Sequence, residues 1–353
     1  MVLPTRKLSS LCVVAAIAFI GGPIAVSPIA SASNDPAFSS QWGLDVANIN
    51  EAQTISTGAG VTVAVIDSGS GPNPDLSQNL LPGRSIVRGR IGDLSADVDT
   101  VGHGTHVAGI IAGQRDNGIG ISGIAPDAKI LPIRILDSRG DGSESDLVQA
   151  IRLAVEQGVK VINLSLGGKT QTIALQLALE YAELNNVVVV AAAGNGGPIA
   201  STTYPAGNDL TLAVTAIDQT SNAPSFNQRG TYIDVAAPGV SICSTVRIDS
   251  SADPSRRCAG AGEPYATMSG TSIAAAFVSG VAALIYSVRP DFTAAQVREI
   301  ITTTAKDIGA EGRDETFGAG LIDAYAIFKA LGYFPDNIVF PTVSSLGRVG
   351  QES

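Results

Sequence analysis

The sequence predicts an α/β protein built around a mostly parallel sheet with helices on both faces, and two observations support this fold class. Short runs rich in Val and Ile alternate along the chain with segments long enough for helices. Runs that are apolar throughout indicate strands buried on both faces, as in parallel sheets with helical crossovers. Polar and glycine residues follow several of these runs, where open parallel sheets place a ligand crevice.

The elements can be assigned in chain order. The expected strands occupy residues 61–66, 130–136, 161–166, 187–193 and 212–217. Helices are expected to begin after Gly102, at Ser143 to Glu144, near Thr172 and near Ser272. Asp67 follows the first strand, Gly167 and Gly168 follow the third, and Gly194, Asn195 and Gly196 follow the fourth. We therefore expect the functional site at the carboxyl ends of these strands.

The first 33 residues have the pattern of a secretory signal peptide. Arg6 and Lys7 precede an apolar stretch that closes on Ala30, Ser31 and Ala32, the small-residue spacing of a cleavage site. We expect cleavage after Ala32 or Ser33, and a secreted, extracellular protein. Residues 34–331 are expected to form one domain, because no linker or repeat interrupts them, and residues 332–353 form a C-terminal tail without an evident role.

Charge and cysteine content limit the partners and the compartment. The signal peptide carries two basic and no acidic residues, so its removal takes the net charge from −10 to −12. Such an acidic protein is not expected to bind nucleic acid or anionic membranes. Cys12 leaves with the signal, and Cys243 and Cys258 remain as an even pair in an oxidising compartment. We expect a disulfide, with two buried thiols as the alternative.

The only two histidines of the chain lie in VGHGTHVAGI, at positions 103 and 106. The zinc helix motif needs two histidines at i and i+4 with an acid between them, so this spacing argues against a metal. His103, at a helix start among glycines, suits a general base, and His106 is expected to be a packed, hydrogen-bonded residue. Asp67, after a buried strand, and Ser272, at the start of an apolar helix, are the candidate partners of His103.

Asp67, His103 and Ser272, with the GHGTHVAG and GTS contexts, resemble the subtilisin-like serine proteases (subtilases, peptidase S8), and the thermitase-like members in particular. The order Asp, His, Ser is the one found in subtilisin. The resemblance covers about residues 34–331. It implies a three-layer fold and a serine endopeptidase acting on proteins or peptides through an acyl-enzyme. Ser272 would attack the scissile carbonyl, His103 would relay the proton and Asp67 would orient the imidazole.

The resemblance also assigns binding residues. VVVAAAGNGG at 188–197 is similar to the oxyanion segment, which implies Asn195 as a donor beside the Ser272 N–H. Ser165, Leu166 and Gly167 would line S1 to S4 by pairing with an extended substrate. The S1 wall and floor would be formed by Ala192, Ala193, Gly194 and Thr203. Because these positions are not acidic, we expect uncharged, apolar P1 side chains.

The family's calcium site also finds matches. The resemblance implies Asp35, Asp75, Arg115, Asn117, Ile119 and Ile121 as ligands, with Arg115, Ile119 and Ile121 contributing backbone carbonyls. Carboxylates and backbone oxygens are the donors that Ca²⁺ takes in proteins. A turn without metal is the alternative for residues 115–123.

Two alternatives to a general endopeptidase stay open at this point. A dedicated processing or acyl-transfer protease would share all the catalytic residues and differ in its pockets. An inactive peptide-binding relative would need a damaged triad or oxyanion hole, and the sequence shows neither. We expect a monomer without a stable membrane anchor.

Overall fold

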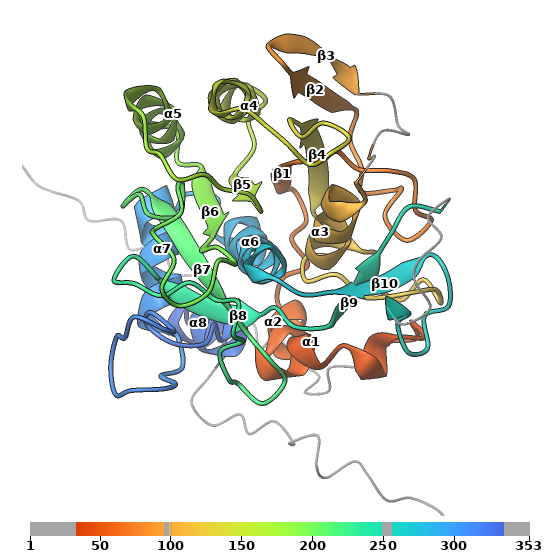
Figure 1. Ribbon diagram of the computed structural model, residues 1–353. Coiled ribbons are helices and arrows are strands. Elements are labelled where there is room, and N and C mark those ends of the chain that lie inside the picture. The colour runs from red at the N-terminus through yellow and green to blue at the C-terminus, as the bar shows by residue number, and fades with distance from the viewer. Residues whose placement is uncertain (1–32, 95–98, 100, 249–255, 335–353) are drawn as a thin grey trace, which may run out of the picture. The chain divides into compact units, whose positions relative to one another are not determined.

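The computed structural model describes residues 33–94, 99, 101–248 and 256–334 (Figure 1). The strands are β1 (Thr62–Asp67), β2 (Gly83–Val87), β3 (Arg90–Leu94), β4 (Lys129–Arg134), β5 (Val161–Leu164), β6 (Val188–Ala192), β7 (Thr211–Ile217), β8 (Val235–Pro238), β9 (Ile242–Thr245) and β10 (Tyr265–Met268). The helices are α1 (Trp42–Val46), α2 (Ile49–Gln53), α3 (His103–Ala112), α4 (Glu144–Glu156), α5 (Ile173–Leu184), α6 (Thr271–Val288), α7 (Ala294–Thr303) and α8 (Ala324–Ala330).

The main sheet of the described residues contains eight strands in the order β3-β2-β4-β1-β5-β6-β7-β8. β3 pairs antiparallel with β2, and the other neighbours in this sheet pair in parallel. A separate antiparallel pair is formed by β9 and β10. The predicted fold class, a mostly parallel sheet in an α/β protein, is therefore confirmed.

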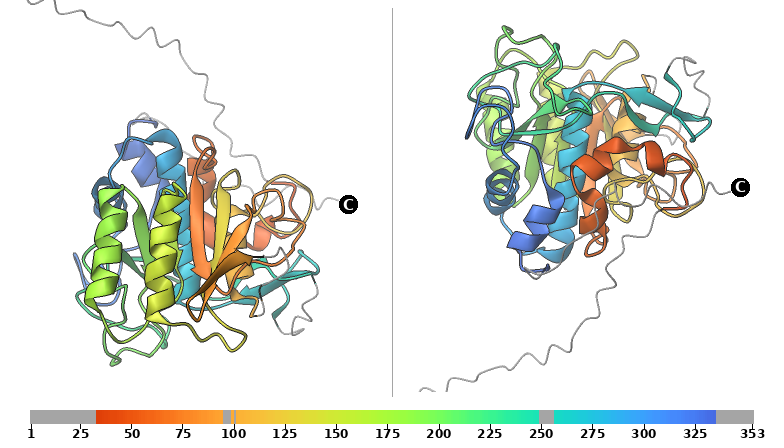
Figure 2. Two further views of the ribbon diagram at one scale, coloured as in Figure 1. Left: turned by 90° about the horizontal axis from the view of Figure 1, so that it is seen from above. Right: turned by 90° about the horizontal axis from the view of Figure 1, so that it is seen from below.

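Helices cover both faces of the main sheet. Figure 2 shows α4 and α5 side by side on one face, whereas α6 runs behind the sheet on the other, where it packs against α3. The core under α4 and α5 is formed by aliphatic residues from these helices and from β1, β4, β5 and β6. Strands β1, β5, β6 and β7 are buried along nearly all of their length. This burial explains their continuous apolar sequences.

The starts of α4 and α5 follow local capping chemistry. The Ser143 hydroxyl accepts a hydrogen bond from the Asp146 N–H, and the Thr172 hydroxyl accepts one from the Leu175 N–H, so both residues are N-caps.

Helix α6 is long and apolar enough to cross a membrane, but 83% of its 18-residue window is buried inside the protein. It is therefore the core helix on which Ser272 is carried.

Two predicted strands end earlier than their apolar runs. β4 ends at Arg134 and β5 ends at Leu164, two residues before the ends of the runs. The N–H groups of Ile135 and Leu136 both bond the Asp67 carbonyl, which turns the chain away from β4 at the end of the sheet. The residues that leave the sheet here line the cleft described below.

Candidate active site

Asp67 and His103 meet at the end of the first sheet strand. Asp67 is the last residue of β1 and has no exposed surface, and His103 is the first residue of α3. The His103 Nδ1 atom lies 2.9 Å from each carboxylate oxygen of Asp67. This contact leaves Nε2 as the ring nitrogen that can exchange a proton with a nucleophile.

The approach of α3 to β1 depends on a residue without a side chain. A Cβ atom at Gly104 would lie 2.0 Å from the Gly69 carbonyl oxygen and 3.2 Å from the Asp67 Cβ. The Gly104 N–H bonds the Ser68 hydroxyl at 2.9 Å. The glycine after His103 therefore permits the close packing that brings the imidazole to Asp67.

A second buried carboxylate holds the chain around His103. Asp99 has no exposed surface, and its Oδ1 accepts hydrogen bonds from the Ser68 hydroxyl (2.7 Å) and from the N–H groups of Val101 and Gly102 (3.2 and 2.7 Å). Its Oδ2 accepts from the N–H and hydroxyl of Thr105. Asp99 thus bonds residues on both sides of His103 and the residue after Asp67. Sequence reasoning did not identify it.

The charges near His103 favour its protonated form. Burial lowers the pKa of His103, but the charge and hydrogen bond of Asp67, and then the charge of Asp99, outweigh burial and raise the pKa above 6.5. The His103 side chain keeps 27% of its surface exposed, so it remains open to the cleft. The site therefore stabilises the imidazolium that a general base becomes during catalysis.

Ser272 lies in the first turn of α6 and contacts Ser165. The Ser272 hydroxyl donates to the Ser165 carbonyl at 3.1 Å, and the Ser165 hydroxyl donates to the Ser272 carbonyl at 2.7 Å. Ser165, which holds the Ser272 hydroxyl, lines the same cleft as His103. Bonds between nucleophile and base are often loose before substrate binds, and here the hydroxyl rests on Ser165.

Asn195 is oriented by the residue before the candidate nucleophile. Its Oδ1 accepts from the Thr271 N–H at 2.9 Å and from the Thr271 hydroxyl at 3.1 Å. The remaining polar group of the amide is the Nδ2 donor. The Ser272 N–H belongs to the first turn of α6, where N–H groups lack partners within the helix. The two predicted oxyanion donors are thus carried by neighbouring elements.

The predicted S1 residues lie together. A Cβ atom at Gly167 would lie 2.2 Å from Thr203 Cγ2, and one at Gly194 would lie 2.7 Å from Thr203 Oγ1 and 1.8 Å from Gln228 Oε1. Gly194 also has a φ of +117°, a conformation that favours glycine. Ala192 and Ala193 precede it at the end of β6, and the Ala193 carbonyl accepts from the Tyr232 hydroxyl. Gln228, which bonds Thr203 at 2.9 Å, was not predicted.

Ser165, Leu166 and Gly167 line one cleft together with His103. This cleft has a volume of about 540 Å³ and continues past Gly168 to the loop that leads from β4 to α4. The residues that the resemblance assigned to S1 through S4 therefore border an open channel beside the candidate base. Residues 140–144 also line this channel and were not predicted from the sequence.

His106 is buried on the far side of α3 from solvent. It has no exposed surface, and its Nε2 lies 3.1 Å from the Ala266 carbonyl. Burial, together with the nearby His103, lowers the pKa of His106 to about 3. His106 is therefore neutral, in agreement with its expected role as a packed residue.

The predicted calcium ligands partly converge on one loop. Both oxygens of Asp35 accept hydrogen bonds, from the N–H groups of Asp116, Asn117 and Gly118 and from the hydroxyls of Ser33 and Ser122. Asp75 accepts from the Ile121 N–H and from Asn117 Nδ2. Burial raises the pKa of Asp75 to about 6. The guanidinium of Arg115 turns away toward Gln53 and the Phe38 ring, and Ile119 lies on the same loop with its N–H on Asn117.

The carboxylate, amide and backbone oxygens around this loop are the types of ligand that Ca²⁺ binds. No group of three or more His, Cys, Asp or Glu side chains is placed to hold a metal in the part of the chain that the structure describes. Asp75 and Asn117 would thus need backbone oxygens as further ligands, which Ca²⁺ accepts. Asp35 would have to exchange some of its present hydrogen bonds to join them.

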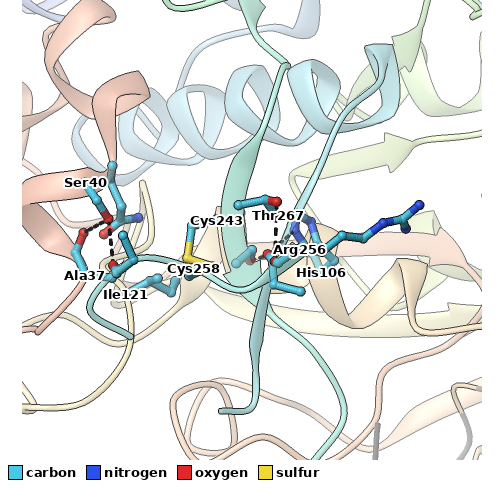
Figure 3. Close-up of a disulfide and its surroundings, with 12 residues drawn as sticks. Ala37, Ser40, His106, Ile121, Cys243, Arg256, Cys258 and Thr267 are labelled. Atoms are coloured by element: carbon cyan, nitrogen blue, oxygen red, sulfur yellow. Dashed lines mark hydrogen bonds between the residues drawn. A yellow bond between two sulfur atoms is a disulfide. The ribbon is translucent and has the colours of Figure 1, made fainter. Parts of the chain in front are cut away.

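Cys243 and Cys258 form a disulfide that packs against the N-terminal segment (Figure 3). The bonded cysteines belong to a buried cluster with Ala37, Ile121 and Tyr265. The Ser40 hydroxyl also donates to the Ala259 carbonyl at 3.1 Å. The disulfide therefore packs between the β9–β10 pair, the segment that carries Asp35 and the loop that carries Ile121.

Comparisons with known proteins show which family the chain resembles. The model of the subtilase family, Peptidase_S8, matches residues 58–320. Thermitase of Thermoactinomyces vulgaris is 40% identical over 303 residues, which cover 85% of this chain and 99% of thermitase. M-protease of Shouchella clausii (strain KSM-K16) is 39% identical over 270 residues, or 76% of this chain, and the matched part spans only 64% of M-protease.

A solved structure is similar as well. It is a protease structure from Pseudoalteromonas arctica, and it superposes with a TM-score of 0.75 at 31% identity, covering 85% of this chain and 99% of that one. The resemblance first inferred from three short motifs is thus confirmed along most of the sequence and in the fold. The chain belongs to the subtilase family.

Proposed function

We propose that this chain is a serine endopeptidase that cleaves proteins through Asp67, His103 and Ser272. The observation that carries the proposal is that His103 contacts Asp67 and lines a cleft together with Ser165, the residue that holds the Ser272 hydroxyl. Asp67 ends β1, His103 begins α3 with its Nδ1 2.9 Å from the Asp67 carboxylate, and Ser272 lies in the first turn of α6 against Ser165. A nucleophile, a base and an orienting carboxylate in this arrangement suit acyl transfer.

In the first half-reaction, the Ser272 hydroxyl leaves Ser165 and attacks the scissile carbonyl. His103 Nε2 takes the hydroxyl proton, and Asp67 stabilises the resulting imidazolium. The carbonyl oxygen becomes an oxyanion that accepts hydrogen bonds from Asn195 Nδ2 and from the Ser272 N–H. The C–N bond then breaks, and His103 returns the proton to the leaving amine, which gives an ester of Ser272.

In the second half-reaction, a water molecule replaces the amine. His103 takes a proton from the water as it attacks the ester, and the same donors hold the oxyanion. The C–O bond to Ser272 breaks, the proton goes to the serine oxygen, and a carboxylic acid leaves. Each proton that His103 accepts is thus returned within the same half-reaction.

The substrates are expected to carry uncharged, apolar P1 side chains. Gly167, Gly194, Thr203 and Gln228, which surround the proposed S1 position, are all uncharged. Digestion of a whole proteome, with sequencing of the new termini, tests both the reaction and this preference. Cuts mainly after apolar residues in many proteins support the proposal, whereas cuts confined to one motif would indicate a dedicated processing protease.

Calcium is proposed as a structural ligand, with no part in the chemical steps. Asp75 and Asn117 would hold it, together with Asp35 and the carbonyls of Arg115, Ile119 and Ile121. Its effect would be to join the N-terminal segment to the 115–121 loop. The melting temperature of Ser272→Ala, which cannot digest itself, should fall when EGTA replaces millimolar Ca²⁺. The fall in melting temperature should be much smaller in Ser272→Ala/Asp75→Asn. Equal falls in the two proteins would contradict the assignment of Asp75 as a ligand.

Secretion is proposed from residues 1–33, of which 1–32 lie outside the described residues. The Lys and Arg, the apolar stretch and the Ala-Ser-Ala end support a signal peptide. Residues 34–331 would then be the peptidase domain, and 332–353 a tail. N-terminal sequencing of the exported protein should begin at Ser33 or Asn34, and a retained N-terminus would contradict the proposal.

A further inference from the structure

One wall of the cleft beside His103 is apolar. The cleft is lined by Ile135, Leu147 and Leu175, which are 2%, 5% and 1% exposed, and by the half-buried Leu136 and Leu166. These side chains come from the ends of β4 and β5 and from the first turns of α4 and α5. They form a surface against which an aliphatic chain can lie.

An acidic residue stands at the rim of this apolar surface. Glu144 is the first residue of α4, and its carboxylate accepts a hydrogen bond from the Thr172 hydroxyl, the N-cap of α5. The carboxylate therefore lies at the N-terminal ends of two helices, where the helix dipoles stabilise negative charge. The contact with Thr172 uses one carboxylate oxygen, Oε1.

The charge of the cleft is carried mainly by Glu144. Among the described residues that line it, Asp141 and Glu144 are acidic, and His103 is the basic one. The Asp141 side chain is 72% exposed and lies 3.4 Å from Arg139, which offsets its charge. Glu144 is half-buried, and its carboxylate bonds the uncharged Thr172.

The geometry points to Glu144 as a specificity residue that selects Lys or Arg four positions before the scissile bond, at P4. This inference rests on the proposed endopeptidase function. A long basic side chain would lay its aliphatic part against the apolar wall of the cleft and bring its cation to Glu144. Aliphatic side chains would gain only the first of these contacts.

The position follows from the geometry of an extended peptide. Side chains at alternate residues point to the same side, about 7 Å apart. A substrate paired with Ser165, Leu166 and Gly167 therefore presents P2 and P4 to one side of the cleft. P2 lies next to His103, beside the scissile bond, so P4 is the side chain that reaches the wall with Glu144.

Peptide hydrolysis measures the preference directly. Substrates that differ only at P4, as Lys, norleucine or Glu, should show a kcat/KM ratio of Lys to norleucine of about three- to fivefold at low salt. The ratio should fall toward one in about 1 M NaCl because the ion pair is screened. It should also fall to about one in Glu144→Gln. The matched control, Glu156→Gln at the other end of α4, should keep the wild-type ratio.

Binding separates this inference from the proposed reaction. Labelled peptides with Lys or norleucine at P4 can be titrated onto Ser272→Ala. The Lys peptide should bind about three- to fivefold more tightly than the norleucine peptide. In Ser272→Ala/Glu144→Gln the two peptides should bind equally well. The role of Glu144 would be overturned if the Lys to norleucine ratio, in hydrolysis or in binding, were the same with Glu144 and with Glu144→Gln. A Glu144-dependent ratio in binding without any hydrolysis by the wild type would contradict the endopeptidase proposal instead.

Discussion

At the scale of single residues, Asp99 connects the chain next to Asp67 with the chain on either side of His103. Its carboxylate bonds Ser68, which follows Asp67, and the chain on either side of His103. It does not contact the reacting atoms, so it is a positioning residue. It acts on His103 both through geometry and through its charge, which is one of the causes of the raised His103 pKa.

Asp99→Asn should therefore change the pH profile as well as the rate. An amide of the same size cannot accept all of these hydrogen bonds, so kcat/KM should fall about tenfold or more. The charges that face His103 are those of Asp67 and Asp99, and loss of one lowers the pKa of His103. Because catalysis needs neutral His103, the acid limb of the kcat/KM profile should move to lower pH.

A matched control is Asp146→Asn. Asp146 is also buried, but its carboxylate bonds the N–H groups of Arg88 and Gly89 in the β2–β3 turn. This variant should lower the melting temperature and leave the acid limb in place. If Asp99→Asn behaved in the same way, Asp99 would be a purely structural residue.

His106 should make the fold sensitive to acid. Its pKa is about 3 in the folded protein, below the ordinary value of 6.5. Below about pH 6.5 the unfolded chain binds a proton that the folded protein refuses, so the free energy of unfolding falls as pH decreases toward 3. His106→Gln should be less stable than its parent at pH 7 but lose less stability between pH 7 and pH 4.

The measurement is thermal unfolding in a Ser272→Ala background, where autolysis does not interfere. His103→Ala in the active protein should instead abolish turnover with a smaller change in stability. An equal loss of stability with acid in His106→Gln and its parent would contradict the role of His106. The reverse pattern, with His106→Gln inactive and stable, would exchange the two roles.

At the scale of elements, the disulfide restrains the loop that precedes β10 and α6. The chain from Cys243 to Cys258 has a sequence separation of 15, and such a closed loop is worth roughly 3 kcal/mol in the chain-entropy model. The disulfide connects β9 to the segment that precedes β10, and β10 in turn precedes the Gly270–Ser272 turn. Residues 249–255 of this loop lie outside the described residues.

Mild reduction should therefore cause cleavage within residues 244–257 before the protein unfolds globally, because proteases cut extended and mobile segments most readily. Mass spectrometry of non-reduced, alkylated protein should find neither cysteine alkylated. Two alkylated cysteines would refute the bond in the exported protein. An unchanged cleavage pattern after reduction would mean that packing against Ala37 and Ile121 holds the loop.

The same elements show what sequence could and could not predict. Strands β1, β4, β5, β6 and β7 and the starts of α3, α4, α5 and α6 were predictable because continuous apolar runs, glycines and capping residues are local signals. Strand β8 is also buried in the sheet but was not predicted. The β2–β3 pair was not predicted, because its strands are short and Ile91 in β3 is 63% exposed. The pairing of β9 with β10 depends on contacts with Ala37 and Ile121, which are remote in sequence.

The residues of the candidate site also divide into those that local motifs predict and those that depend on remote contacts. Asp67, His103, Ser272 and Asn195 lie in motifs that a family resemblance can locate. Asp99 was missed because Asp93, Asp97 and Asp99 all precede His103 closely, and no local pattern says which of them is buried. Glu144 was missed because its role depends on Thr172 across the gap between α4 and α5.

At the scale of the whole molecule, the parallel sheet gathers the chemistry at one edge. β1, β5 and β6 end at Asp67, Leu164 and Ala192, so the segments that follow them meet at their common carboxyl ends. Helices α3 and α6 begin at the same edge and bring His103 and Ser272 to it. We propose that this arrangement makes Ser272 a nucleophile.

Labelling with a fluorophosphonate tests that proposal most directly, because an activated serine displaces the fluoride to form a phosphonate ester and no particular substrate is needed. The mature protein should take up one label per chain, with the modified peptide containing Ser272, and the rate should increase as pH rises and His103 loses its proton. Ser272→Ala should remain folded and unlabelled, and Asp67→Asn should react much more slowly. Labelling of Ser272→Ala at the wild-type rate, or a modified site elsewhere in the chain, would contradict the account.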